Sequence, residues 1–314
     1  MYAIQQEAIG EQANAKLRAH LAQLAKASAG WVALDQIKAF VNCFDHLPRH
    51  SGYKYVPASA HVIQQEILQS RGDAASRGFL YACMLQGLLK CLSSEAFAAL
   101  PVRIKGHQLK QYGRILDKST VIIETCELDS DLFHKDLGLA LMRLYAAAAQ
   151  MVDHDAGIGR AILFADGATH LPVRLALFAK LGGFKPFFEI HTHLSYLDEF
   201  TEEGWNECYR CCADLYAIHP HVLGMQGGSW FYDPALAAIS PRLAYLREVP
   251  KKGGAHLLYA STDAHLVHDA TSTSPTRKKL YEDGQYRPKS FTLIWPRADQ
   301  IEWAKSNAAA GAPT

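Results

Sequence analysis

Three side chains of two chemical types recur at every second position of one short segment. Glu189, His191 and His193 lie in Phe187–His193, whose aromatic and β-branched residues predict a strand. Side chains alternate between the two faces of a strand, so all three are expected on one face. A carboxylate and two imidazoles on one face either ligate a metal ion or line a polar pocket for acid–base chemistry.

The first interpretation is a metal site. His191 and His193 would supply two imidazoles, and Glu189 or Asp263 a carboxylate, to one divalent transition metal. A His-x-His strand followed by an Asp-containing strand end resembles the amidohydrolase and polymerase-histidinol-phosphatase types of metal hydrolase. The resemblance implies a metal-activated water, in a metal-dependent enzyme of hydrolase or oxygenase type. The span between the two motifs is too short for the barrel of those hydrolases.

The elements that position these residues change character along the chain. Residues 1–117 show helical patterns and no strand-like alternation, whereas residues 118–306 alternate β-branched runs with helical ones. The predicted helices of the first part are Gln12–Lys26, Trp31–Phe44, Ala60–Gln69 and Arg77–Leu92. We predict an α+β protein, with a helical N-terminal domain (1–117), a mixed α/β sheet domain (118–306) and a frayed tail (307–314).

Both strands and helices are predicted in residues 118–306. Its predicted strands are Thr120–Cys126, Arg160–Ala165, Phe187–His193, Val222–Tyr232, Leu243–Val249, His256–Ala260 and Ser290–Trp295. Its predicted helices are Leu137–Met151, Val173–Lys180, Thr201–Ile218, Ser274–Asp283 and Asp299–Lys305.

The order of elements from residue 187 to 296 carries a second interpretation. It runs strand, long helix, Gly-bearing strand, strand, Gly turn, helix, strand. This order resembles the GNAT superfamily of acyl-CoA-dependent N-acyltransferases and implies an acyltransferase-like sheet topology. Leu246–Ala255 is similar to the family's strand leading into its pyrophosphate-binding turn, and Leu280–Tyr286 is similar to its late helix.

The GNAT resemblance implies roles for particular residues. Acyl-CoA would be bound by backbone N–H groups of the turn, and an amine on a small substrate would be acylated. Glu189 or His191 would be the general base, and Tyr281 the general acid that protonates the departing thiolate. The cofactor-binding residues implied are Lys251, Lys252, Gly253, Gly254 and Ala255.

Composition narrows the remaining classes. A formal net charge of +1 gives no general attraction to nucleic acid or to acidic membranes. Neither a signal peptide nor an apolar stretch of membrane-spanning length is visible. Seven cysteines do not form a disulfide framework, which favours a cytoplasmic protein. Cys208-x-x-Cys211 has no second cysteine pair to complete a zinc site.

The leading hypothesis is therefore an acyl-CoA N-acyltransferase-like enzyme that acts on a small-molecule substrate. A metalloenzyme and a non-catalytic small-ligand-binding module are its alternatives. The sequence leaves a homodimer open.

Overall fold

The computed structural model describes residues 15, 18–19, 22–23 and 34–307. The predicted helix Gln12–Lys26 and the predicted tail 307–314 therefore fall almost wholly outside the described residues. The chain divides into two compact units, each described by itself below. Unit 1 runs to Asp155 and also includes His193–Ser195, and unit 2 comprises Ala156–Thr192 and Tyr196 onward.

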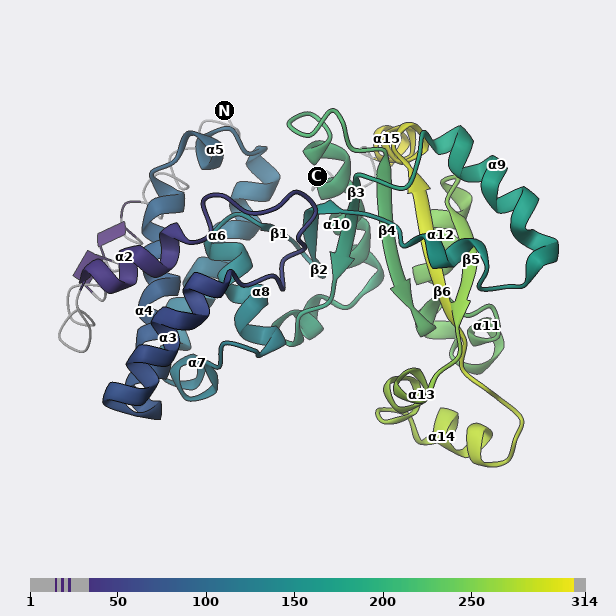
Figure 1. The fold of residues 1–314 in the computed structure, drawn as a ribbon. Helices are drawn as coiled ribbons and strands as arrows, with labels where there is room; N and C mark the ends of the chain where they lie inside the picture. The colour runs from purple at the N-terminus through teal and green to yellow at the C-terminus, as the bar shows by residue number, and fades with distance from the viewer. Residues whose placement is uncertain (1–14, 16–17, 20–21, 24–33, 308–314) are drawn as a thin grey trace, which may run out of the picture. The chain divides into compact units, whose positions relative to one another are not determined.

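Unit 1 is mainly helical (Figure 1). Its central helix is α4, which is buried along most of its length because Phe79, Leu80, Cys83, Met84 and Leu88 are all almost inaccessible to solvent. The predictions of helices at Trp31–Phe44, Ala60–Gln69 and Arg77–Leu92 are confirmed. The helices of unit 1 are α2 (Leu34–Asn42), α3 (Ala58–Arg71), α4 (Asp73–Leu92), α5 (Glu95–Ala98), α6 (Val102–Asp117), α7 (Ser119–Thr125) and α8 (Asp131–Ala140).

A β-hairpin completes unit 1. Strands β1 (Leu144–Ala147) and β2 (Gln150–Ala156) pair antiparallel, and Ala148 makes the turn with a φ of 49°. The buried side chain of Gln108 on α6 accepts a hydrogen bond from the Ala146 N–H at 2.8 Å and donates one to the Leu139 carbonyl at 3.1 Å. A helix side chain thus satisfies a backbone N–H of β1 and a backbone carbonyl of α8 that lie in the buried interior.

Two predictions for this region are wrong. The run Thr120–Cys126, predicted as a strand, forms α7, none of whose residues is buried. A β-branched run favours a strand only where it packs in a sheet, and here it continues the helical region instead. The predicted helix Leu137–Met151 ends at Ala140 and gives way to the hairpin. Burial of the alanines of β1 outweighs their helix propensity.

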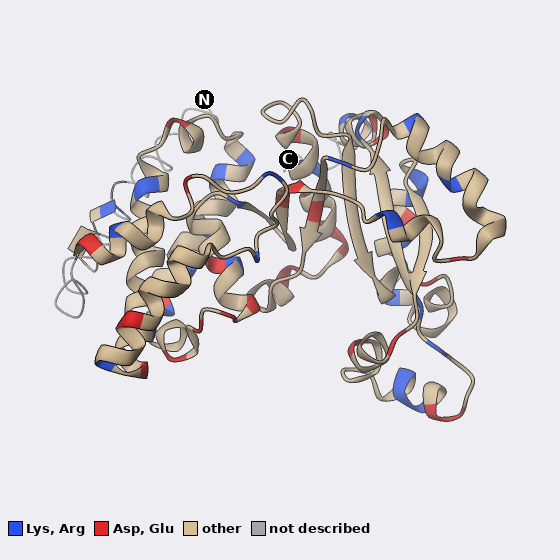
Figure 2. Ribbon diagram, in the orientation of Figure 1, with Lys and Arg blue, Asp and Glu red and all other residues tan. Residues whose placement is uncertain are grey.

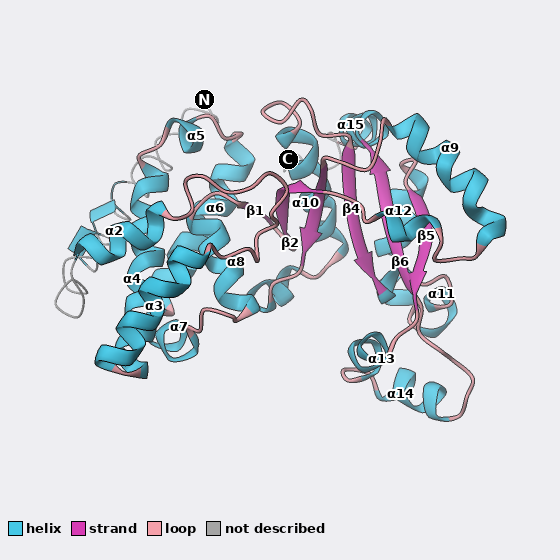
Figure 3. Ribbon diagram, viewed as in Figure 1, coloured by secondary structure: helices cyan, strands magenta, loops and turns pink. Residues whose placement is uncertain are grey.

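Unit 2 is built on a mixed sheet. Its strand order is β3-β4-β6-β5, with β3 parallel to β4 and the other neighbours antiparallel (Figure 3). The strands are β3 (Phe187–His191), β4 (Gly224–Ser229), β5 (His256–Ser261) and β6 (Ser290–Pro296). The helices are α9 (Leu171–Leu181), α10 (Glu202–Leu215), α11 (Leu236–Ile239), α12 (Tyr245–Lys252), α13 (Ala264–Thr271), α14 (Pro275–Glu282) and α15 (Arg297–Ser306), with short 3-10 turns η1 (Arg160–Leu163), η2 (Ala168–His170), η3 (Leu194–Glu199), η4 (Trp230–Tyr232) and η5 (Pro241–Leu243).

Helices cover both faces of this sheet. On one face, Phe187 and Ile294 pack with Phe178 of α9 and with residues of η1. On the other face, Phe188 stacks on Tyr216 beyond the end of α10 at 4.9 Å. Successive residues of β3 thus enter opposite layers, as strand geometry requires. Strands β4, β5 and β6 carry no charged side chain (Figure 2), which fits a sheet covered on both sides.

The structure corrects other element predictions in unit 2. Arg160–Ala165, predicted as a strand, contains the 3-10 turn η1, and Leu243–Val249, also predicted as a strand, lies mainly in η5 and α12. The apolar residues of Leu243–Val249 are spaced to bury one side of a short helix, with Leu246 fully buried. The predicted strands at Phe187, Val222, His256 and Ser290 and the predicted helices at Val173, Thr201, Ser274 and Asp299 are present, with shifted ends.

The fold class α+β is confirmed: a helical N-terminal region precedes the sheet. The compact units divide between Asp155 and Ala156, later than the predicted boundary at 117/118. Residues 118–155 belong to unit 1 because α8 and β1 pack on α4 and α6. None of the described helices combines the length and the apolar character that crossing a bilayer requires.

Two glycines test how closely these helices are packed. Gly106 lies in the interior of α6 and a Cβ there would meet nothing within 4 Å. We expect Gly106→Ala to raise the free energy of unfolding by about 0.5–1 kcal/mol, because alanine loses less backbone entropy on folding. Gly204→Ala should instead lower it by about 1–3 kcal/mol, since its Cβ would lie 2.0 Å from the Glu199 carbonyl oxygen. Urea denaturation measures both, and equal effects would contradict this packing.

Candidate functional site

Glu189 and His191 lie on β3 and share one face of the sheet of unit 2. Nε2 of His191 is 3.9 Å from a carboxylate oxygen of Glu189, and the two side chains are 18% and 35% exposed. Phe187 precedes them on the same face and is fully buried. The face therefore changes from apolar and covered to polar and accessible within two residues, as the alternation of the sequence predicted for these two side chains.

The neighbouring strands extend this polar position into a pocket. Glu189 is in register with Gln226 of β4, and Gln226 with Ile294 of β6, so Gln226 lies on the same face as Glu189. A pocket of about 480 Å³ opens there, and Gln226 and Thr292 are its polar lining residues. The apolar lining comes from η1 and its flanks and from β5, through Ile158, Ala161, Ile162, Phe164 and Ala260.

Gly228 leaves the same face open beyond Gln226. It is in register with Thr292, it is exposed, and a Cβ at this position would meet nothing within 4 Å. The strand pairs described between β3 and β4 are Phe188 with Met225 and Glu189 with Gln226. Glu189 thus occupies the last described pair of the parallel ladder, next to accessible space.

His193 does not join this face, which corrects the prediction that it would. It follows β3 in the chain, packs with unit 1 and is buried. Its Nδ1 accepts a hydrogen bond from the Ser195 N–H at 3.0 Å, and its Nε2 lies 3.5 Å from Asp136. Because Nδ1 accepts this bond, Nε2 is the ring nitrogen that carries a proton, and it faces the carboxylate.

Asp136 of α8 is the centre of this buried cluster. It is 4% exposed and forms a two-pronged ion pair with Arg114 of α6, one arm of which measures 3.3 Å. Burial alone would raise the pKa of the Asp136 carboxyl, but the hydrogen bond from His193 and the charge of Arg114 outweigh burial and hold that pKa below its usual range. No local pattern in the sequence marks this cluster, since its members are far apart in the chain.

Asp263 is not near Glu189 and His191 either. Its side chain caps α13 by accepting a hydrogen bond from the Leu266 N–H at 2.8 Å. It follows β5, which is separated from β3 by β4 and β6. Adjacent strands are about 4.8 Å apart, so the two positions are about 14 Å apart, whereas ligands of one ion lie within about 2.3 Å of it. The predicted metal set of His191, His193, Glu189 and Asp263 is therefore not brought together.

The predicted phosphate-binding turn has the wrong polarity. Lys251 and Lys252 end α12, Gly253 caps it, and Gly254 turns the chain with a φ of 92° into Ala255. The N–H groups of Gly253, Gly254 and Ala255 bond to the carbonyls of Val249, Lys251 and Pro250. A helix C-terminus with occupied N–H groups presents carbonyl oxygens, which do not favour a phosphate.

Tyr281 is likewise remote from the polar pair. It lies on α14 and is 41% exposed. Figure 1 shows α14 beyond the ends of β5 and β6, and β3 is separated from β6 by β4 in the sheet. The structure thus brings together Glu189 and His191 of the predicted catalytic residues, and it separates Tyr281 from them.

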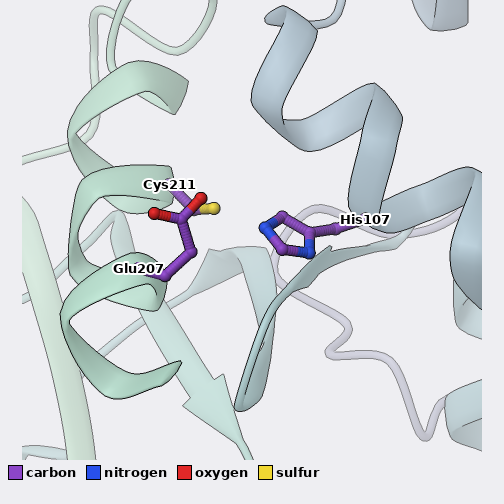
Figure 4. Close-up of side chains that lie close together, drawn as sticks. All are labelled: His107, Glu207 and Cys211. Atoms are coloured by element: carbon purple, nitrogen blue, oxygen red, sulfur yellow. The ribbon is translucent and has the colours of Figure 1, made fainter. Parts of the chain in front are cut away.

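The cysteines of α10 are structural. Cys208, Cys211 and Cys212 are fully buried, and burial raises the pKa of the Cys208 thiol well above its usual value. Figure 4 shows Glu207 and Cys211 one turn apart on α10; His107, also drawn there, belongs to α6 in the other unit. The Cys208 thiol is therefore a buried apolar core group and not a nucleophile.

Sequence reasoning missed the pocket-lining residues. Gln226 and Thr292 are polar side chains within two strands, and their shared face follows only from the register of β4 and β6. Ala161 and Phe164 were predicted to lie in a strand, although Ala161 lies in η1 and Phe164 follows it directly. Comparisons of the chain with family models, curated proteins and solved structures found no match.

The buried cluster of unit 1 generates a stability prediction. Asp136→Asn should lower the free energy of unfolding at neutral pH by about 3 kcal/mol, because it leaves the Arg114 charge buried and uncompensated. As a control, Asp73→Asn removes an ion pair to Arg77 on the surface. This substitution should change the free energy of unfolding little.

A comparison of the native protein with Asp136→Asn at different pH values gives a second test. The folded pKa of Asp136 is lowered, so its contribution is complete above the unfolded pKa of about 3.9 and disappears as pH falls through the folded pKa. The difference between native protein and Asp136→Asn should therefore shrink only below about pH 4. Urea denaturation at several pH values measures it, and a difference that vanishes already at pH 6 contradicts the assigned charge states.

Proposed function

We propose that unit 2 is the catalytic unit of an acyl-CoA-dependent N-acyltransferase of GNAT type that acts on a small amine. The proposal is carried by Glu189, a partly exposed carboxylate in the last described pair of the parallel strands β3 and β4, whose register partner Gln226 lines an open pocket. The order of elements adds no support, because the segment that the resemblance to GNAT takes as the strand before the Gly turn forms helix α12.

The reaction requires one base and an electrophilic acyl group. A primary amine is protonated at neutral pH, so a carboxylate is needed to hold the ammonium group and remove a proton. The amine nitrogen then forms a bond to the thioester carbonyl carbon, and the carbon–sulfur bond breaks. The departing thiolate takes up a proton from solvent, because a thiol pKa of about 8.5 makes a positioned acid unnecessary near neutral pH.

Glu189 is better suited than His191 to be the base. Its side chain is more exposed, and its strand position puts it in register with the pocket residue Gln226. His191 lies farther along β3, and its Nε2 is 3.9 Å from the Glu189 carboxylate. The turn Lys251–Ala255 is not part of the proposal, because its described N–H groups are already used.

A small-ligand-binding module is the second candidate, and the pocket itself favours it. A pocket with an apolar wall and a few polar groups is the usual form of a ligand site, whether or not chemistry follows. The acyltransferase and the binding module would both bind a small ligand, but only the acyltransferase would convert it.

Transfer from acetyl-CoA to a panel of primary amines, followed by thiol release, tests the proposal. We expect turnover by the native protein, and Glu189→Gln should lower kcat/KM by about 10²- to 10³-fold because the base is lost. Glu302→Gln, an exposed carboxylate on α15, is the matched control and should retain activity. Binding of amines without any thiol release would favour the binding module, and undiminished turnover by Glu189→Gln would remove Glu189 from the reaction.

A further inference from the structure

The pocket beside Glu189 divides its lining by polarity. Ile158, Ile162 and Phe164 form an apolar wall, and Ala161 and Ala260 add two methyl groups. Of the described residues that line it, none carries an ionisable side chain. A charged or strongly hydrated group would lose its hydration in this space without gaining an ionic partner, whereas an apolar group is favoured by leaving water.

The polar groups lie where the sheet forms the pocket. Gln226 and Thr292 are on β4 and β6, and Nε2 of Gln226 donates to the Gly157 carbonyl at 3.5 Å. Glu189 is in register with Gln226 on the next strand and is the ionisable group nearest to it in the ladder. An apolar body and a cationic end therefore have adjacent places on one face of the sheet.

The entrance is also apolar. Phe164 lines the pocket and is 63% exposed, so a large aromatic side chain faces water at its edge. Gly228 leaves accessible space on the same face near Thr292. The exposed phenyl ring loses contact with water when an apolar ligand enters, which adds to the free energy of binding.

We propose that the substrate of this site is an arylalkyl or alkyl primary amine, whose apolar body fills the pocket while its ammonium group pairs with Glu189. This inference names the substrate class of the proposed acyl transfer and rests on that function only for the chemical step. The volume of about 480 Å³ accepts a phenyl ring with a short chain.

Binding of 2-phenylethylamine to the full chain, without acyl-CoA, is the test. Isothermal titration and ligand-observed NMR compare it with ethylamine, which lacks the body, and with 3-phenylpropionate, which carries the opposite charge. We expect 2-phenylethylamine to bind at least about tenfold more tightly than either, since burial of the ring and the charge pair both contribute. Equal affinity for ethylamine, or tighter binding of 3-phenylpropionate, overturns the inference.

Variants locate the ligand. Ala161→Trp fills the pocket from an exposed position and should weaken binding of 2-phenylethylamine at least about tenfold. Ala176→Trp, on the exposed face of α9, is its matched control and should have no effect. Ala165→Trp tests the same pocket from a second lining residue and keeps the test valid if Ala161→Trp does not fold. Unchanged binding in both pocket variants overturns the inference.

The outcomes separate the inference from the proposed function. Glu189→Gln should weaken 2-phenylethylamine about tenfold and leave 2-phenylethanol, which is uncharged, unchanged. If the ranking of ligands holds and no thiol is released from acetyl-CoA, the substrate class stands as a ligand class and the acyltransferase falls. If acetyl-CoA is consumed with polar amines while 2-phenylethylamine does not bind, the acyltransferase stands and the inference falls.

Discussion

Burial of both faces of the sheet is the constraint on which unit 2 depends. Phe187 is covered by the layer that contains Phe178, and Phe188 by the layer that contains Tyr216. A strand between two helical layers admits polar side chains only where the cover ends, because a buried charge without a partner is strongly unfavourable. The step from buried Phe187 to a Glu189 side chain that is 35% exposed marks that end. The candidate site is therefore a consequence of the layer arrangement.

The same constraint explains why His191 and His193 lie in different environments. His191 stays on the strand, at the accessible end of a covered face. His193 lies beyond the strand and is buried beside Asp136, where a hydrogen-bonded acceptor on one ring nitrogen leaves the other as a donor to the carboxylate. An imidazole with both nitrogens engaged in this way is a structural group. A His-x-His pattern defines a metal site only while both residues remain in one strand.

The sequence predicted much of unit 2 and less of its surroundings. Regular apolar spacing located α10, and alternation located β3, because both signals depend on neighbours in the chain. The hairpin β1–β2 was missed because its alanines have high helix propensity, and only burial against α6 and α8 makes them strands. Leu243–Val249 was misread for the opposite reason: a few apolar residues fit a short strand or a short helix equally well.

Of the candidate site, the sequence predicted only the part that lies within one strand. Glu189 and His191 share a strand, so their proximity followed from the alternation alone. Tyr281, Asp263 and the Lys251–Ala255 turn were joined to them by resemblance, and their places depend on strand order and on helix direction. Gln226 and Thr292 could not be found in advance, because a register between strands is a tertiary property.

Accessibility of the carboxylate also limits how the site can work. A fully buried Glu189 would favour its neutral form and could not hold an ammonium group, whereas a fully solvated one would pair with it only weakly. At 35% exposure, with the apolar pocket on one side, the carboxylate lies between these extremes. In the proposed reaction, the pocket would bind the apolar part of an amine through loss of water, so the carboxylate would not have to supply all the affinity. A moderate ionic attraction would then leave the proton of the ammonium group transferable in that reaction, because a very strong pair would stabilise the protonated amine and oppose attack on an acyl carbon.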